Sequence, residues 1–297
     1  MPVHELAALG AALCWSVSGL IAAGAVQSLG PFAFNRLRWG LVFLMLALIV
    51  AATGRWSWGT APDLARLALS GLLGVFLGDM MLFMTMVRLG PRRTGALFAL
   101  NAPIAALLGW QFLGEDLSAL AVAGVGLSTL GVALAVLGRP GRAGAHGFEA
   151  VRGPVWLAVG LGVLAAAGQA AGSLVARPVM AQGFDPYLAS LIRIGVSAVG
   201  QLALMTLPLQ ALRPQAPLTG RRLLQTALSG LVAMVIGMTL LMFALQGGQV
   251  GIVSTLSALS PVLILPVLWM LTGARPSATS WAGAGLAVLG MALIFLR

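Results

Sequence analysis

Long apolar runs alternate with short polar turns over almost the whole chain. Glycine, proline and arginine mark the turns and divide the sequence into ten apolar segments. We expect these segments at 5–28, 32–52, 65–88, 94–113, 118–137, 155–181, 186–208, 223–246, 249–271 and 277–296. A helix needs about 20 such residues to cross the hydrocarbon core of a bilayer. A membrane β-barrel would instead show alternating segments of about ten residues. The pattern therefore predicts an all-α integral membrane protein with ten transmembrane helices.

One polar interruption separates the apolar segments into two groups of five. Residues 138–154, with the sequence GRPGRAGAHGFEAVRGP, form the longest hydrophilic stretch of the chain. We therefore divide the chain into a first five-helix unit at 1–137, a polar linker at 138–154 and a second five-helix unit at 155–297.

The two units resemble each other in sequence. The pentad ALSGL at 68–72 recurs at 227–231. The same offset pairs several glycines, and a slightly smaller offset pairs a proline and an arginine near the start of each unit. These pairs are Gly78 with Gly237, Gly124 with Gly283, Gly126 with Gly285, Gly131 with Gly290, Pro31 with Pro186 and Arg38 with Arg193. Chance does not keep an offset this steady, so the units are copies of one repeat.

An odd number of spans per repeat has a topological consequence. After five spans, the second copy must enter the membrane upside down. Inverted repeats place a shared central cavity between two halves, a geometry typical of alternating-access transporters. The alternative is a duplicated bundle with no transport role.

The composition supports the membrane assignment and excludes nucleic-acid binding. The chain is 60% hydrophobic and 8% charged, with a mean hydropathy of +1.01, whereas soluble domains carry about 25% charged residues. The net charge is +10, but all 17 basic residues are arginines, most of them single or paired in short loops. A nucleic-acid site would need them clustered on one soluble face.

The arginines also bear on orientation. Four lie on the membrane side that carries the N-terminus, at 55, 66, 177 and 297. Ten lie on the other side, at 88, 92, 93, 139, 142, 152, 213, 221, 222 and 275. The positive-inside rule therefore favours an external N-terminus. With ten spans, both termini are expected on the same side.

Charged residues inside the predicted spans are the strongest candidates for chemistry. Each costs roughly 2.5–3.5 kcal/mol at a helix centre on insertion scales. Asp79 lies near the middle of the third span, and its repeat partner is Met238. We interpret Asp79 as a site that binds a substrate amino group or exchanges a proton. The alternative is a structural ion pair or a charge lining a pore.

Arg38 and Arg193 occupy matching positions of the two repeats, about a third of the way into the second and seventh spans. The functional interpretation is a pair of cations that flank the cavity and hold a substrate carboxylate. The alternative is that each side chain extends to the membrane interface and leaves only its aliphatic stem in the apolar region.

Polar side chains without charge also occur within the spans. The candidates for the lining of a cavity are Trp15, Asn101, Gln169 and Thr239. For any one of them taken alone, hydrogen bonding between neighbouring helices is the favoured role. Taken together, they predict a polar cavity.

The sequence gives no sign of an enzyme, a metal site or a cofactor. His4 and His146 are isolated, and the single cysteine, Cys14, lies in the first apolar segment. The chain lacks the HExxH, GxSxG and P-loop motifs. Without a nucleotide-binding domain, transport would be secondary or facilitated, with proton coupling as one option.

The whole chain resembles the EamA family of the drug/metabolite transporter superfamily. The best match is RTGALFALNAPIAALLGWQFLGEDLSALAVAGVGLSTLGVALAVL at 93–137, with a proline within the span and an LGE turn ending at Glu115. A weaker echo is GIVSTLSALSPVLILPVLWMLTGARPS at 251–277, where the turn ends at Ala274 and the acid is missing.

This resemblance implies a helical bundle with a central cavity and export of small metabolites, often amino acids. It also implies that Glu115 caps or orders its turn and does not touch substrate. Both termini would lie in the cytoplasm and the protein in the inner (plasma) membrane, against the arginine count. We adopt the cytoplasmic placement as our expectation.

We therefore predict a secondary exporter of small metabolites, most notably amino acids, that works by alternating access. Asp79, Arg38 and Arg193 would set charge selectivity, and the four polar residues would line the cavity. Its partners would be a small-molecule substrate and the lipid bilayer. The alternatives are a flippase for lipid-linked sugars, a pump for hydrophobic drugs, and a membrane scaffold that transports nothing.

Overall fold

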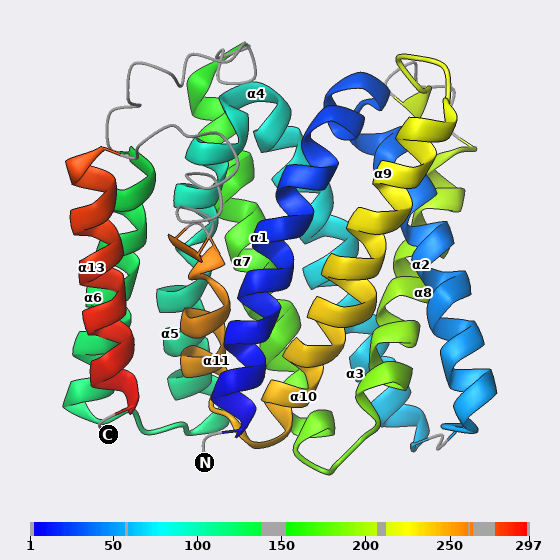
Figure 1. Cartoon of the computed structure of the whole chain (residues 1–297). Helices are drawn as coiled ribbons and strands as arrows, with labels where there is room; N and C mark the ends of the chain where they lie inside the picture. The colour runs from blue at the N-terminus through cyan, green and yellow to red at the C-terminus, as the bar shows by residue number, and fades with distance from the viewer. Residues whose placement is uncertain are drawn as a thin grey trace.

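A chain inside hydrocarbon must satisfy its own backbone hydrogen bonds, so long apolar runs fold as helices. In this computed structural model, all regular elements among the described residues are helices, and most run nearly parallel or antiparallel to one another (Figure 1). The described residues are 3–56, 59–137, 153–206, 212–260, 262–263 and 277–295.

The first half contains α1 (Val3–Leu29), α2 (Pro31–Thr53), α3 (Ala61–Ser70), η1 (Gly71–Leu77), α4 (Gly78–Phe98), α5 (Asn101–Leu113) and α6 (Ala119–Leu137). The second half contains α7 (Val155–Met180), α8 (Pro186–Leu204), α9 (Gly220–Gly230), η4 (Leu231–Met238), α10 (Thr239–Gly247), α11 (Val250–Ser257) and α13 (Ala278–Phe295). α3, η1 and α4 form one continuous helical path as far as Gly90, whose non-helical backbone (φ 80°) separates the two parts of α4, and α9, η4 and α10 form another.

Eight helical stretches of the described ranges are long and apolar enough to cross a membrane. This confirms the prediction of an all-helical, multi-pass membrane protein. The α6 helix is a shorter apolar stretch, and much of the expected ninth span at 249–271 lies outside the described residues. Ten spans therefore stay a prediction. Most of the linker at 138–154 also lies outside the described residues.

Both ends of the described chain lie at one end of the bundle. The α1 helix begins and α13 ends at this end, which we call the termini end (Figure 1). The turns after α5, α7 and α10 lie at the same end, and the turn after α1, the turn at Gly90 inside α4 and the end of α8 lie at the opposite end (Figure 1). The turns at one end of the bundle can therefore contact one another on one side of the membrane, and the turns at the other end on the other side.

Each half interrupts its third span with a π-helix at the corresponding place. These are η1 at Gly71–Leu77 and η4 at Leu231–Met238. A π-helix is rare and often accompanies a functional site because it changes the direction of the side chains that follow. Asp79 is the second residue after η1, and Met238 is the last residue of η4. The backbone therefore repeats at the place where the side chains differ.

Glycines bring α7 against η1 and the start of α4. A methyl group added at Gly172 would lie 2.7 Å from the Cα of Gly74. One added at Gly168 would lie 2.9 Å from the Leu73 carbonyl oxygen and 3.4 Å from the Cα of Gly78. Such close backbone approach is typical of packing in membranes, where small residues form the helix interfaces.

The last helices of the two halves, α6 and α13, pack side by side along their length (Figure 1). A methyl group at Gly124 would lie 2.7 Å from the Gly290 carbonyl oxygen, and one at Gly131 would lie 2.7 Å from the Gly283 carbonyl oxygen. Low numbers in α6 meet high numbers in α13, so the two helices run antiparallel.

Candidate functional site

The acid inside the third span pairs with an arginine of the second span. One carboxylate oxygen of Asp79 on α4 lies 3.7 Å from Nη1 of Arg38 on α2. The side chain of Asp79 is 17% exposed and that of Arg38 is 5% exposed. The Asp79 side chain is therefore partly accessible, whereas that of Arg38 is buried.

Two aromatic rings hold the Arg38 guanidinium in place. Its central carbon lies 5.7 Å from the ring centroid of Phe34 and 5.3 Å from that of Phe83. Phe34 lies one turn before Arg38 on α2, and Phe83 lies one turn after Asp79 on α4. Cation–π attraction at these distances strengthens when the groups are desolvated. Arg38 is thus fixed by an acid and by two rings.

Arg193 is the other buried cation, and its surroundings differ. It is fully buried on α8, where its Nη1 lies 3.2 Å from the Met242 sulfur on α10. Its Nε and Nη2 have no hydrogen-bond partner among the described residues. A buried guanidinium without partners for these donors is costly. Arg193 therefore retains the capacity to bind an anion.

The helices around the two arginines mirror each other. A methyl group at Gly71 in η1 would lie 2.6 Å from the Arg193 Cα. One at Gly230, the repeat partner of Gly71, would lie 2.7 Å from a methyl of Val42 and 3.4 Å from the Arg38 Cγ. Each half thus packs the glycine of its third span against the arginine helix of the other half. Both arginines lie where the two halves meet.

Two further candidates join this group through α7 and α8. A methyl group at Gly74 would lie 2.9 Å from Arg193 Nη2 and 3.5 Å from Gln169 Oε1, so both side chains reach the same glycine. Thr239 and Ser190, on α10 and α8, have their hydroxyl oxygens 3.3 Å apart, one turn from Arg193. The structure therefore brings Gln169 and Thr239 near Arg193.

The last two candidates are not tied to Asp79 by the contacts of the described residues. The Trp15 indole N–H donates to the Ala233 carbonyl of η4 at 2.9 Å. That hydrogen bond links α1 to η4, so it fits the alternative role of Trp15, hydrogen bonding between neighbouring helices. Asn101 is buried at the start of α5, with neither amide atom paired among the described residues.

Some neighbours of the site did not stand out in the sequence. Met242 contacts Arg193 through a sulfur, and nothing in an apolar run singles out one methionine. Asn35 is fully buried with both amide atoms unpaired among the described residues. Asn35 lies three residues before Arg38, so both residues lie on one face of α2. This spacing is the feature of the sequence that could have identified Asn35.

Comparison with known proteins decides the family. The model of the EamA-like transporter family matches residues 3–137 and again residues 156–296. The chain belongs to the EamA-like transporter family.

The family match confirms two expectations. The protein is a membrane transporter of the drug/metabolite transporter superfamily, and it is not an enzyme, because the family comprises transporters. Its partners are therefore a small-molecule substrate and the lipid bilayer.

A solved structure titled "Crystal structure of protein" shares the fold. It has 18% sequence identity and a TM-score of 0.78, and the match covers 99% of this chain and 96% of the other. A likeness at that identity carries the fold alone. No curated protein matches the chain.

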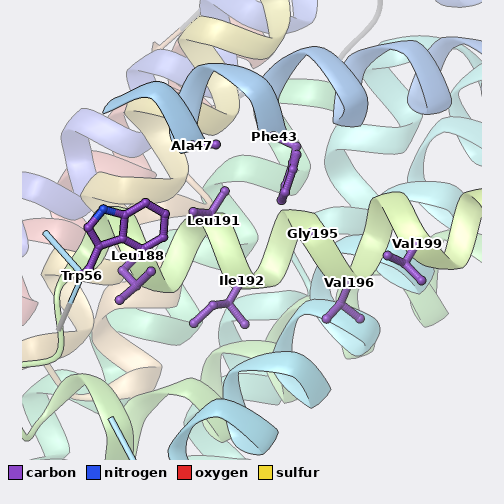
Figure 2. Close-up of a pocket in the computed structure, with 9 residues that line it drawn as sticks. All are labelled: Phe43, Ala47, Trp56, Leu188, Leu191, Ile192, Gly195, Val196 and Val199. Atoms are coloured by element: carbon purple, nitrogen blue, oxygen red, sulfur yellow. The ribbon is translucent and has the colours of Figure 1, made fainter. Parts of the chain in front are cut away.

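One surface groove of this EamA-like transporter lies apart from the polar group. It lies between α2 and α8, holds about 440 Å³, and has Phe43 and Trp56 on one wall and Leu188 to Val199 on the other (Figure 2). Its lining is apolar, and none of the candidate polar residues contributes to it. A groove with so few polar groups fits an apolar chain better than a polar metabolite.

Proposed function

We propose that this EamA-like transporter is a secondary exporter of small metabolites, amino acids in particular, working by alternating access. The observation that carries the proposal is the group of one partly accessible acid and two buried arginines at the meeting of the two halves. Charged groups buried at membrane depth mark substrate or ion pathways.

The chemistry of the group supports a zwitterionic substrate. Asp79 has a partly accessible side chain and offers a carboxylate to an ammonium group. Arg193 has unpaired Nε and Nη2 donors and offers them to a carboxylate. Arg38 is held by Asp79 and two rings, so its role is to orient the acid. Proton coupling through Asp79 belongs to the same proposal.

Alternating access requires two halves that exchange roles, and the helix contacts support this requirement. We propose that the repeats are inverted around a central cavity. The antiparallel pair of α6 and α13 and the reciprocal packing of Gly71 on Arg193 and Gly230 on Arg38 support an inverted arrangement. Inverted repeats place substrate sites near the midplane at the repeat interface.

The test is a ligand-stabilisation screen of the purified protein with amino acids, nucleosides, sugars and lipophilic cations. A ligand that binds only the folded state raises its stability, by about 2.7 kcal/mol at a hundred times its Kd. We expect zwitterionic amino acids to raise the Tm more than amines or carboxylic acids that carry one charge. Stabilisation by lipophilic cations alone would favour a drug pump, and stabilisation by sugars alone would favour a flippase for lipid-linked sugars. No stabilisation and no flux in proteoliposomes would favour a scaffold.

An Arg193→Gln variant is expected to weaken binding of carboxylate-bearing ligands by about tenfold to a hundredfold, because a charged hydrogen bond contributes about 1.5–3 kcal/mol. Arg213→Gln, at an exposed position, is the matched control and should bind like the parent protein. Isothermal titration of both variants with the best ligand of the screen checks this. Equal affinities for both variants would contradict the role of Arg193.

For orientation, we propose that both termini are cytoplasmic in the inner (plasma) membrane, as the family resemblance implies. A reporter that is active only in the cytoplasm, fused after the last residue, should be active. The counterpart is a reporter that is active only in the opposite compartment. If the cytoplasmic reporter is inactive and this counterpart is active, the arginine distribution predicts the topology correctly.

A further inference from the structure

Glu115 reaches from the first half of the chain to the second. It follows Gly114, the left-handed residue that ends α5 with a φ of 62°. Its carboxylate oxygens accept the backbone N–H of Val250 at 2.8 and 3.0 Å. Val250 is the first residue of α11, where free N–H groups and the helix dipole favour a negative charge. One side chain thus connects α5 with the start of α11.

Two further contacts join the same place. Arg177, near the end of α7, has its Nε 3.9 Å from a Glu115 oxygen, and this Nε donates to the Gly248 carbonyl at 2.8 Å. The Gln249 amide donates to the Asp116 carbonyl at 3.1 Å. The turn after α5, the end of α7 and the turn before α11 are therefore tied together at the termini end.

Glycines allow the tight fit that these contacts need. A methyl group at Gly109 would lie 2.6 Å from the Glu115 carboxylate, and one at Gly251 would lie 2.7 Å from the Cα of Ala106. The helices α5 and α11 thus touch backbone to backbone beside the carboxylate. Glu115 is also mostly shielded, with its side chain 11% exposed.

The repeat partners of these groups cannot form the same contact at the opposite end. The offset that pairs Gly78 with Gly237 pairs Glu115 with Ala274, which has no carboxylate, and Val250 with Pro91, which has no backbone N–H. The offset that pairs Arg38 with Arg193 pairs Arg177 with Ala22. All three partners are therefore lost in the other copy.

We propose that Glu115, Arg177 and the Val250 N–H form a latch that holds the termini end closed, and that its absence from the opposite end biases the transporter toward opening there. We call this group the Glu115 latch. It rests on the alternating access of the proposed function, because a conformational bias matters only if both ends open. Opening at the termini end requires that the turn after α5 separates from α7 and α11, which breaks the latch.

The test measures the separation directly and needs no substrate. Cys14 is replaced by alanine, and spin labels are attached at cysteines introduced at Ala119 and Gln182, which are exposed beside the latch on the α5–α6 and α7–α8 turns. Double electron–electron resonance of the full chain in nanodiscs then reports the distribution of distances between the labels.

We expect one dominant short distance in the labelled parent. Glu115→Ala should raise the ratio of a longer distance to the short one by about tenfold, because it removes charge-assisted hydrogen bonds. Glu115→Gln keeps one acceptor for Val250 and should shift the ratio less. Asp116→Asn removes a charge from the same turn without touching the latch, since only the Asp116 backbone carbonyl is used, and should leave the distribution unchanged.

Arg177→Gln is the second route if Glu115→Ala does not fold, and it should shift the distances in the same direction. The proposal is overturned if Glu115→Ala or Arg177→Gln lowers the Tm while the distances stay those of the parent, because the contact would then only stabilise the fold. It is also overturned if Asp116→Asn shifts the distances equally. If the distances between the labels shift but the protein transports nothing, the exporter proposal is wrong and the proposal of the Glu115 latch stands.

Discussion

Asp79→Asn is expected to reduce transport by about tenfold to a hundredfold while the protein still reaches the membrane. Asparagine keeps the shape of the side chain but removes the charge that would hold a substrate ammonium or a proton, and a charged hydrogen bond contributes about 1.5–3 kcal/mol. Of the three charged side chains of the site, that of Asp79 is the most accessible. Flux in proteoliposomes at matched protein content measures the effect.

The control must separate this role from that of a structural ion pair. Asp79→Asn leaves the Arg38 guanidinium without its acid, and removal of one partner of a buried pair costs about 3–5 kcal/mol of stability. The double variant Arg38→Gln with Asp79→Asn removes both charges and should recover most of that stability but not the transport. Wild-type flux in the single variant, or in the double variant, would falsify the role of Asp79.

Gly131→Ala is expected to destabilise the protein by about 1–3 kcal/mol, the usual cost of an extra carbon in a packed interface. The added methyl would meet the backbone of α13, with the Gly283 carbonyl oxygen 2.7 Å away, and a backbone cannot rotate aside as a side chain can. Thermal unfolding in detergent, followed by the loss of a monodisperse peak, measures the effect.

Gly126→Ala lies on the same helix and supplies the matched control. A methyl at Gly126 meets nothing within 4 Å. Alanine also suits a helix better than glycine, by about 1 kcal/mol. The control should therefore melt at the parental temperature or above it. If both variants melt alike, the close approach of α6 and α13 does not contribute to stability.

The sequence predicted the helices well because the bilayer imposes one simple requirement. A span must be apolar over about 20 residues, and this requirement is visible in each run separately. The start of α2 and α8 was equally visible, because Pro31 and Pro186 each occupy the first turn of a helix, where a missing N–H costs nothing. The π-helices were not predicted, because they depend on how glycine-rich segments pack against a neighbouring helix.

The site was predicted as a set of residues but not as a set of contacts. Charges inside a span stand out by type, so Asp79, Arg38 and Arg193 could be found. Their unequal roles could not, because Arg38 meets Asp79 and two rings while Arg193 lies between Gly74 and Met242. Apart from Phe34 on the helix of Arg38 itself, these partners come from three other elements, α4, η1 and α10. Glu115 was expected to order its own turn, whereas its carboxylate binds a helix 135 residues away.

The contact between α6 and α13 has a consequence for how the two halves can differ. If the two repeats exchange places, Gly124 takes the place of Gly283 and Gly290 takes the place of Gly131. The contact of Gly124 with Gly290 then becomes the contact of Gly283 with Gly131, which is also present. The pair of helices is therefore isologous, like the interface of a two-fold symmetric homodimer. In a homodimer of one five-helix repeat, every substitution would appear twice. Fusion into a single chain removes this restriction. Mutation can then place an aspartate at 79 opposite a methionine at 238, and selection can act on each half of the transporter independently.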